Sequence, residues 1–214
     1  MNLNEIRNSI NQASLRAGRS ADAASLMVVS KNQLSKDICP LLEAGHRFFG
    51  EARVQETAAK WPTLRKIYPD CHVHLIGPLQ TNKVRQALEL FDAIESVDRP
   101  RLILELAKEW SNPHRKTHKL LIQVNTGQEP QKSGVLIDNL PDLIHLCHLH
   151  NLPITGFMCI PPLLGDPTLH FQKLANLAKT YNLPELSMGM SGDYPLAIAH
   201  GATCVRIGSA IWTS

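Results

Sequence analysis

One lysine of this chain stands where an amine could act as a nucleophile. Lys31 directly follows the mostly apolar segment 26–30, whose adjacent valines are typical of a strand buried on both faces. The lysine is therefore expected at the end of that strand, beside apolar side chains. Apolar surroundings favour the neutral form of an amine, which can form a Schiff base with an aldehyde. An ordinary solvated loop lysine is the alternative that this segment alone leaves open.

Two glycine-containing segments near the C-terminus could bind a phosphate group. The first is 189–192, Gly-Met-Ser-Gly, in which the serine is Ser191, and the second is Gly208-Ser209. Small residues let backbone N–H groups approach a phosphate closely, and a serine hydroxyl can donate to it. Glycine is also a common turn former, so either segment alone is weak evidence. Together they favour a phosphate site, because each follows one of the last two predicted strands.

An arginine precedes the second of these segments on the last predicted strand. Arg206 is a guanidinium that does not release its proton, so a ring nitrogen that accepts its hydrogen bond stays unprotonated. The alternative is a structural ion pair with a carboxylate such as Asp193 or Glu51. A ligand with an aldehyde, a ring nitrogen and a phosphate would use Lys31, Arg206 and the glycine segments together. Pyridoxal 5′-phosphate is such a ligand.

The elements that must position these residues alternate between strand and helix patterns. Short apolar segments predict strands at 26–30, 47–49, 72–76, 93–97, 119–124, 154–158, 185–188 and 203–207. Segments with helical spacing of apolar residues separate them, and a further helix, 3–17, precedes the first strand. This alternation predicts an α/β fold, a parallel (β/α)8 TIM barrel, as a single domain over 1–214 in which the N-terminal helix of 1–19 packs on the barrel. A doubly wound open sheet is the rival architecture.

The segment after the second predicted strand contains a proline. Residues 50–53 are expected to open a helix that carries Val54, Ala58 and Trp61. Pro62 should break this helix, because a proline inside a helix lacks an N–H and clashes with the preceding turn.

Composition limits the classes of function. The 214 residues, 43% of them hydrophobic, fit one α/β domain, and 22 basic against 19 acidic residues give a net charge of +3. The basic residues are scattered, so we expect no nucleic-acid partner. Five cysteines without a C-x-x-C pair indicate reduced thiols and a cytoplasmic protein. No apolar segment approaches the roughly 18 residues of a membrane span, and the first residues lack a signal-peptide pattern, so we expect no membrane association.

One pair and one group of three histidines are candidate metal ligands. His72 and His74 alternate along the third predicted strand, and His145, His148 and His150 lie near a helix end. Neither group has a carboxylate or cysteine at the spacing of metal ligands. We therefore expect no metal site.

Several strings of residues resemble those of the pyridoxal phosphate homeostasis protein family. They are V-V-S-K at 28–31, F-G-E at 49–51, V-Q-E at 54–56, H-L-I-G-P-L-Q-T-N-K at 74–83, Q-V-N at 123–125, L-S-M-G-M-S-G-D at 186–193 and V-R-I-G-S-A-I at 205–211. The resemblance runs from about residue 3 to 211 and implies the fold of the alanine racemase N-terminal domain. It also implies site residues for pyridoxal phosphate: Lys31 as the Schiff-base lysine, Ser191 with the Gly208 and Ser209 backbone at the phosphate, and Arg206 at the pyridine nitrogen. In one departure, Ala52 stands where the family usually has asparagine, which puts any contact of that asparagine in doubt.

The resemblance implies a carrier and no catalytic residue. Such a protein would hold pyridoxal phosphate reversibly and buffer it or deliver it to apoenzymes, as a monomer or weak dimer without turnover. An arginine at the ring nitrogen makes the cofactor a poorer electron sink than a carboxylate would, and the second catalytic face of alanine racemase comes from a separate domain that this length does not accommodate.

Two alternatives remain open. One is a low-activity, racemase-like enzyme acting on amino acids, with His74 or Lys83 as proton carrier; α-proton exchange in D₂O would reveal it. The other is a phosphate-binding barrel enzyme that does not use this cofactor.

Overall fold

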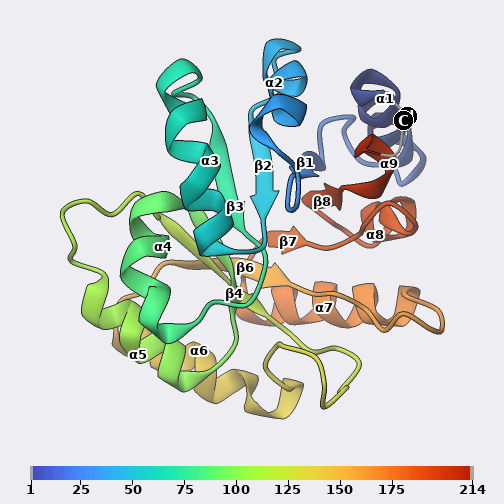
Figure 1. The fold of residues 1–214 in the computed structure, drawn as a ribbon. Coiled ribbons are helices and arrows are strands. Elements are labelled where there is room, and N and C mark those ends of the chain that lie inside the picture. The colour runs from blue at the N-terminus through green and yellow to red at the C-terminus, as the bar shows by residue number, and fades with distance from the viewer. Residues whose placement is uncertain (1, 213–214) are drawn as a thin grey trace.

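A closed barrel of parallel strands forms the centre of the molecule (Figure 1). The computed structural model describes residues 2–212, so Met1, Thr213 and Ser214, the outermost residues of the expected 1–214 domain, lie outside the described part. Each strand pairs with its sequence neighbours, and the last pairs with the first. The strands are β1 (Ser25–Val29), β2 (Phe48–Glu51), β3 (His72–Leu75), β4 (Ala93–Val97), β5 (Lys119–Gln123), β6 (Ile154–Met158), β7 (Glu185–Ser187) and β8 (Cys204–Ile207). The predicted (β/α)8 barrel is confirmed, and the open sheet is excluded.

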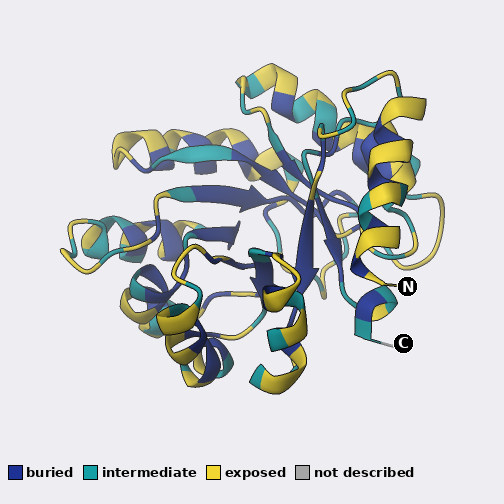
Figure 2. Ribbon diagram, turned by 90° about the horizontal axis from the view of Figure 1, so that it is seen from above, coloured by how far each residue is buried: buried dark blue, intermediate teal, exposed yellow. Residues whose placement is uncertain are grey.

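Helices surround the barrel and turn their apolar faces toward it. Figure 2 shows the strands buried and the helices buried on one side and exposed on the other. Among residues 2–212, no helix has the length and apolar character that crossing a bilayer requires. The helices are α1 (Leu3–Arg16), α2 (Ser35–Glu43), α3 (Val54–Ile67), α4 (Val84–Leu90), α5 (Pro100–Glu109), α6 (Leu140–Leu149), α7 (Thr168–Tyr181), α8 (Tyr194–Ala199) and α9 (Ser209–Trp212), with short 3-10 turns at Thr81–Lys83 and Ile137–Asn139.

Helix α1 begins at a capping box, as its sequence indicates. The Glu5 backbone N–H donates to Asn2 Oδ1 at 2.9 Å, and the Asn2 backbone N–H donates to Glu5 Oε2 at 3.1 Å. The helix lies against α8, where Ser9 Oγ is 2.6 Å from the Tyr194 hydroxyl. α1 thus covers the outside of the barrel beside the strand pair β8 and β1 (Figure 1).

Two expectations about the segment after β2 are wrong. Gly50 and Glu51 pair with β3 and so extend the strand, and α3 begins only at Val54. Pro62 does not end α3, which continues to Ile67. The proline costs one backbone hydrogen bond, but Trp61 on the same helix is completely buried against the barrel. The burial of this large side chain contributes more to the stability of the helix than the loss of one hydrogen bond removes.

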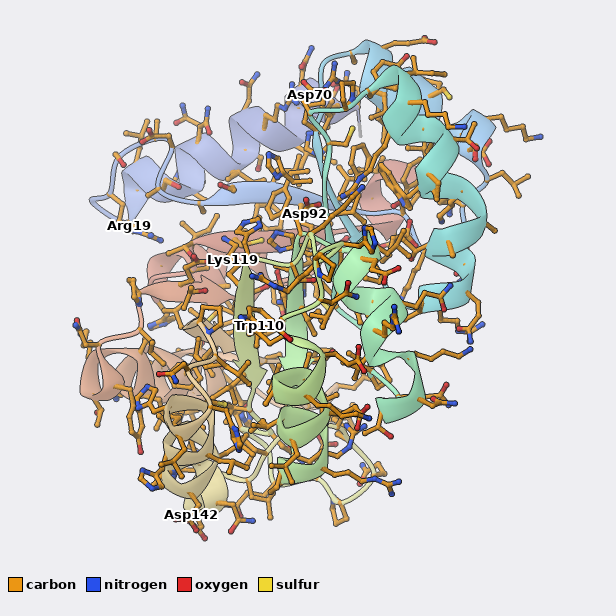
Figure 3. All side chains as sticks on the ribbon, turned by 90° about the vertical axis from the view of Figure 1, so that its left-hand side faces the viewer. Arg19, Asp70, Asp92, Trp110, Lys119 and Asp142 are labelled. Atoms are coloured by element: carbon orange, nitrogen blue, oxygen red, sulfur yellow. The ribbon has the colours of Figure 1, made fainter. Side chains whose placement is uncertain are left out.

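The inside of the barrel is partly polar. His74 Nδ1 lies 2.7 Å from Glu95 Oε1, and Lys119 Nζ lies 2.8 Å from Glu185 Oε2. Figure 3 labels Lys119, at the start of β5. All five cysteines are free thiols, in agreement with the reduced state that the sequence predicts.

Candidate functional site

A cavity of about 750 Å³ opens at the C-terminal ends of the barrel strands. We call it the mouth cavity. Its lining includes Ala52, the position of the departure from the family sequence. It also includes every residue for which the sequence predicted a binding role: Lys31, Ser191, Arg206, Gly208 and Ser209. The structure therefore brings together, at one opening, an amine, a guanidinium and two glycine segments that lie far apart along the chain.

Lys31 occupies the turn that follows β1. Asn32 has a left-handed backbone with φ 63°, and its N–H donates to Glu56 Oε1 at 2.6 Å. From this turn Lys31 lines the mouth cavity. The side chain is exposed, so the apolar surroundings expected from the sequence do not enclose it. The buried strand β1 ends at Val29, and Lys31 lies two residues beyond it, in an exposed turn outside the apolar core.

A buried ionic cluster beneath this turn was not predicted. Lys60 Nζ donates to the carbonyl oxygens of Ser30 at 2.8 Å and Gln33 at 3.1 Å, and it lies 2.9 Å from Glu51 Oε1. Glu51 is completely buried and also accepts from the Ser30 hydroxyl at 2.6 Å. Trp61 Nε1 donates to the same carboxylate oxygen at 2.9 Å. The cluster fixes the backbone on both sides of Lys31.

The two glycine segments meet at the mouth cavity. Ser209 Oγ donates to Ser191 Oγ at 3.2 Å, so the hydroxyl groups of the two loops are neighbours. The Arg206 backbone N–H donates to the Gly189 carbonyl at 2.9 Å and ties β8 to the first segment. The Trp212 indole N–H donates to the Val29 carbonyl at 2.7 Å and fixes α9 over the end of β1. The two predicted loops are thus held side by side.

Arg206 is buried, with 4% of its surface exposed, although it lines the mouth cavity. Its Nη1 donates to Ser187 Oγ at 2.8 Å, and its Nη2 donates to the Cys159 carbonyl at 2.7 Å. Within residues 2–212, no ion pair joins Arg206 to Asp193 or Glu51, so that alternative is not realised. Both acceptors that hold the guanidinium, a hydroxyl and a backbone carbonyl, are neutral groups.

The structure separates the two proton carriers considered for a racemase. His74 does not line the mouth cavity; it lines a cavity of about 220 Å³ together with residues from the beginnings of several strands. Its partner, Glu95, comes from the neighbouring strand β4, a pairing that the sequence spacing did not indicate. Lys83 lines a cavity of about 620 Å³ that also includes Lys31 and adjoins the mouth cavity. Within the described residues, no three histidine, cysteine or acidic side chains form a metal-binding group.

Comparisons with known proteins show what this chain is similar to in sequence and fold. The sequence pattern of the family described as "Alanine racemase, N-terminal domain" matches residues 1–214, which confirms the predicted type of fold. A Vibrio alginolyticus protein named pyridoxal phosphate homeostasis protein is 39% identical over 222 residues, covering 99% of this chain and 95% of that protein. The structure of PipY from Synechococcus elongatus PCC7942 with PLP bound has a TM-score of 0.73 at 38% identity and covers 94% of this chain and 98% of its own. Alanine racemase from Acinetobacter baumannii, with a TM-score of 0.70 at 13% identity over 98% of this chain and 61% of that chain, is similar in fold alone.

Proposed function

This chain belongs to the pyridoxal phosphate homeostasis protein family, and from that premise we propose that it binds pyridoxal 5′-phosphate (PLP) reversibly and maintains its supply. One observation carries this proposal. The mouth cavity brings an amine, a buried guanidinium and the two glycine segments to one opening, and PLP has a matching group for each. With a volume of about 750 Å³, the cavity is also of the size that small-molecule sites usually have.

The five residues divide three roles among them in this proposal. Lys31 supplies the amine to which the aldehyde attaches. Ser191 and the backbone of Gly208 and Ser209 bind the phosphate, since hydroxyl and N–H groups donate to anions. Arg206 donates to the ring nitrogen. PLP, when bound, supplies an electrophilic aldehyde and an aromatic ring that accepts electrons.

The protein acts as a carrier without turnover in this proposal. Racemisation requires acid/base groups on both faces of the substrate α-carbon. His74 is tied to Glu95 inside the barrel, and Lys83 lies in the adjoining cavity, so neither faces the mouth cavity. Arg206 further weakens the cofactor as an electron sink, because it keeps the ring nitrogen unprotonated. PLP-dependent apoenzymes are the recipients, and the free thiols favour a cytoplasmic protein.

The absorption spectrum of the purified protein tests the attachment of PLP. Incubation with PLP should produce a visible absorption band, and Lys31→Ala should abolish it because the variant lacks the amine that binds the aldehyde. Lys36→Ala is the matched control, since Lys36 is an exposed lysine of α2 that lines neither cavity. A band that persists in Lys31→Ala would contradict the proposed attachment.

A further inference from the structure

A line of buried polar side chains crosses the barrel from β3 to β8. His74 and Glu95 form its first half, with His74 Nδ1 2.7 Å from Glu95 Oε1. The Ser187 hydroxyl donates to Glu95 Oε2 and accepts from Arg206 Nη1 at 2.8 Å. Glu95 and Ser187 are each only 1% exposed. TIM-barrel interiors are usually filled by branched apolar side chains, so a buried charge here needs a physical reason.

The hydrogen bonds of Glu95 and the direction of its pKa shift together favour the ionised carboxylate. Arg206 can only donate, and Ser187 has a single hydroxyl hydrogen, so Ser187 accepts from Arg206 and gives its hydrogen to Glu95. Burial raises the pKa of Glu95, but the hydrogen bond and charge of His74 and the charge of Arg206 outweigh burial and lower this pKa overall. Glu95 thus pairs directly with His74 and is joined to Arg206 through one hydroxyl group, so it is a buried counter-ion for both.

The other ionisable groups around Glu95 do not take its place as a counter-ion of Arg206. Lys119 on β5 and Glu185 on β7 line the same 220 Å³ cavity and pair with each other at 2.8 Å. Cys204 on β8 also lines this cavity, and burial raises the pKa of its thiol, so the thiol stays neutral. Among the described carboxylates, Glu95 is the one that a hydrogen-bonded side chain connects to Arg206.

We propose that Ser187 and Glu95 set the strength with which this protein holds PLP. Ser187 fixes the guanidinium of Arg206 toward the ring nitrogen, and the negative charge of Glu95 reduces the positive potential that the nitrogen meets. Both are positioning residues, because they act through Arg206. This inference rests on the proposed function. A carrier must release its cofactor, and a counter-ion behind the arginine keeps PLP from being held as strongly as a lone guanidinium would hold it.

Ser187→Ala tests the positional role. The guanidinium then loses one of the two acceptors that fix it and keeps only the Cys159 carbonyl. We expect the dissociation constant of PLP, measured by titration of the visible band, to rise about fivefold to tenfold, as the loss of one such hydrogen bond implies.

Glu95→Gln tests the role of the charge. Glutamine has the shape of glutamate and can still accept from Ser187, but it carries no charge. We expect PLP to bind roughly threefold more tightly, and to dissociate more slowly, because Arg206 no longer has a counter-ion. Glu185→Gln is the matched control: it removes a carboxylate from the same cavity without a hydrogen-bonded route to Arg206, and it should leave the dissociation constant unchanged.

An analogue of PLP with a CH group in place of the ring nitrogen separates these effects from general damage to the fold. The analogue keeps the aldehyde and the phosphate but cannot accept a hydrogen bond from Arg206. The dissociation constant of the analogue should therefore change by less than about twofold in either variant. Damage to the fold would change the constants of PLP and of the analogue by the same factor.

Several outcomes would overturn the inference. They are equal changes for PLP and the analogue, an unchanged PLP constant in Ser187→Ala, or weaker PLP binding in a folded Glu95→Gln variant. If Glu95→Gln does not fold, the comparison of PLP with the analogue in Ser187→Ala still decides the role of the line of side chains. Failure of the proposed function would look different, because the unchanged protein itself would then show no visible band with PLP.

Discussion

Lys31 is exposed and Lys60 is buried, and the sequence pattern singles out only Lys31. Lys31 follows a short run of apolar residues, which marks the end of a buried strand and hence the mouth of a barrel. Lys60 lies within a helix, where a lysine is usually exposed, yet it is 7% exposed and bonded to the backbone around Lys31. Its only sequence signal is Glu56 four residues earlier, which is typical of surface ion pairs.

His46 makes stability sensitive to acid. Arg7 Nη2 donates to His46 Nδ1 at 3.1 Å, and His46 Nε2 donates to the Phe48 carbonyl at 2.6 Å. Burial lowers the pKa of His46 from 6.5 to about 4; the hydrogen bond to Phe48 opposes this shift, and the charges of Arg7 and Arg47 add to it. Between these two pH values the unfolded chain binds the proton more readily. The free energy of unfolding should therefore decrease as the pH falls through this window, by on the order of 3 kcal/mol at its acid end.

His46→Gln should remove this part of the acid sensitivity. Glutamine can accept from Arg7 and donate to Phe48, but it does not titrate. Urea denaturation at pH 7 and pH 4.5 measures the effect: the difference between the two free energies should be smaller in His46→Gln than in the unchanged protein. His72→Gln, at an exposed histidine, is the control. Equal acid sensitivity in all three proteins would show that His46 is not responsible.

At the scale of elements, the sequence predicted both glycine loops but not which glycines the backbone requires. Gly189 has φ +92°, and a Cβ there would lie 2.6 Å from Ala197 Cβ. A Cβ on Gly192 would meet nothing within 4 Å, and one on Gly208 would be in ordinary contact with Val29 Cβ at 3.4 Å. Whether a glycine is required depends on how closely α8 packs against the loop, and the residue type alone does not reveal this packing.

Gly189→Ala should destabilise the protein by roughly 2 kcal/mol or more, because alanine meets both an unfavourable backbone conformation and a clash. Gly192→Ala, in the same loop, should change the free energy of unfolding by less than about 0.5 kcal/mol. Urea denaturation of the two variants measures the difference. Equal stabilities would show that the loop can relax around residue 189.

Pro62 shows the limit of local rules for helix ends. The proline rule predicted the end of α3 several residues too early, since it considers only the backbone of the helix itself. The same helix buries Trp61 and Leu64 against the barrel, and this tertiary burial keeps it intact.

The closed barrel as a whole could be predicted because its periodic signal repeats along the chain. The residues predicted to line the mouth cavity stand at or just beyond the C-terminal ends of β1, β7 and β8, so their order along the chain assigned them to that end of the barrel. The pairing of His74 with Glu95 could not be predicted in this way. It depends on the register of β3 against β4, in which His74 pairs with Ala93 and Glu95 stands two residues further along. Register in turn follows from packing of the complete barrel, and no single segment specifies it.

The measurement that most directly tests the account is the location of the covalent link between protein and cofactor. The protein loaded with PLP is treated with borohydride, which makes the link permanent, then digested and analysed by mass spectrometry. The added mass is expected on the peptide that contains Lys31. An adduct on Lys132 of the mouth cavity or on Lys83 of the adjoining cavity, with Lys31 unmodified, would contradict it.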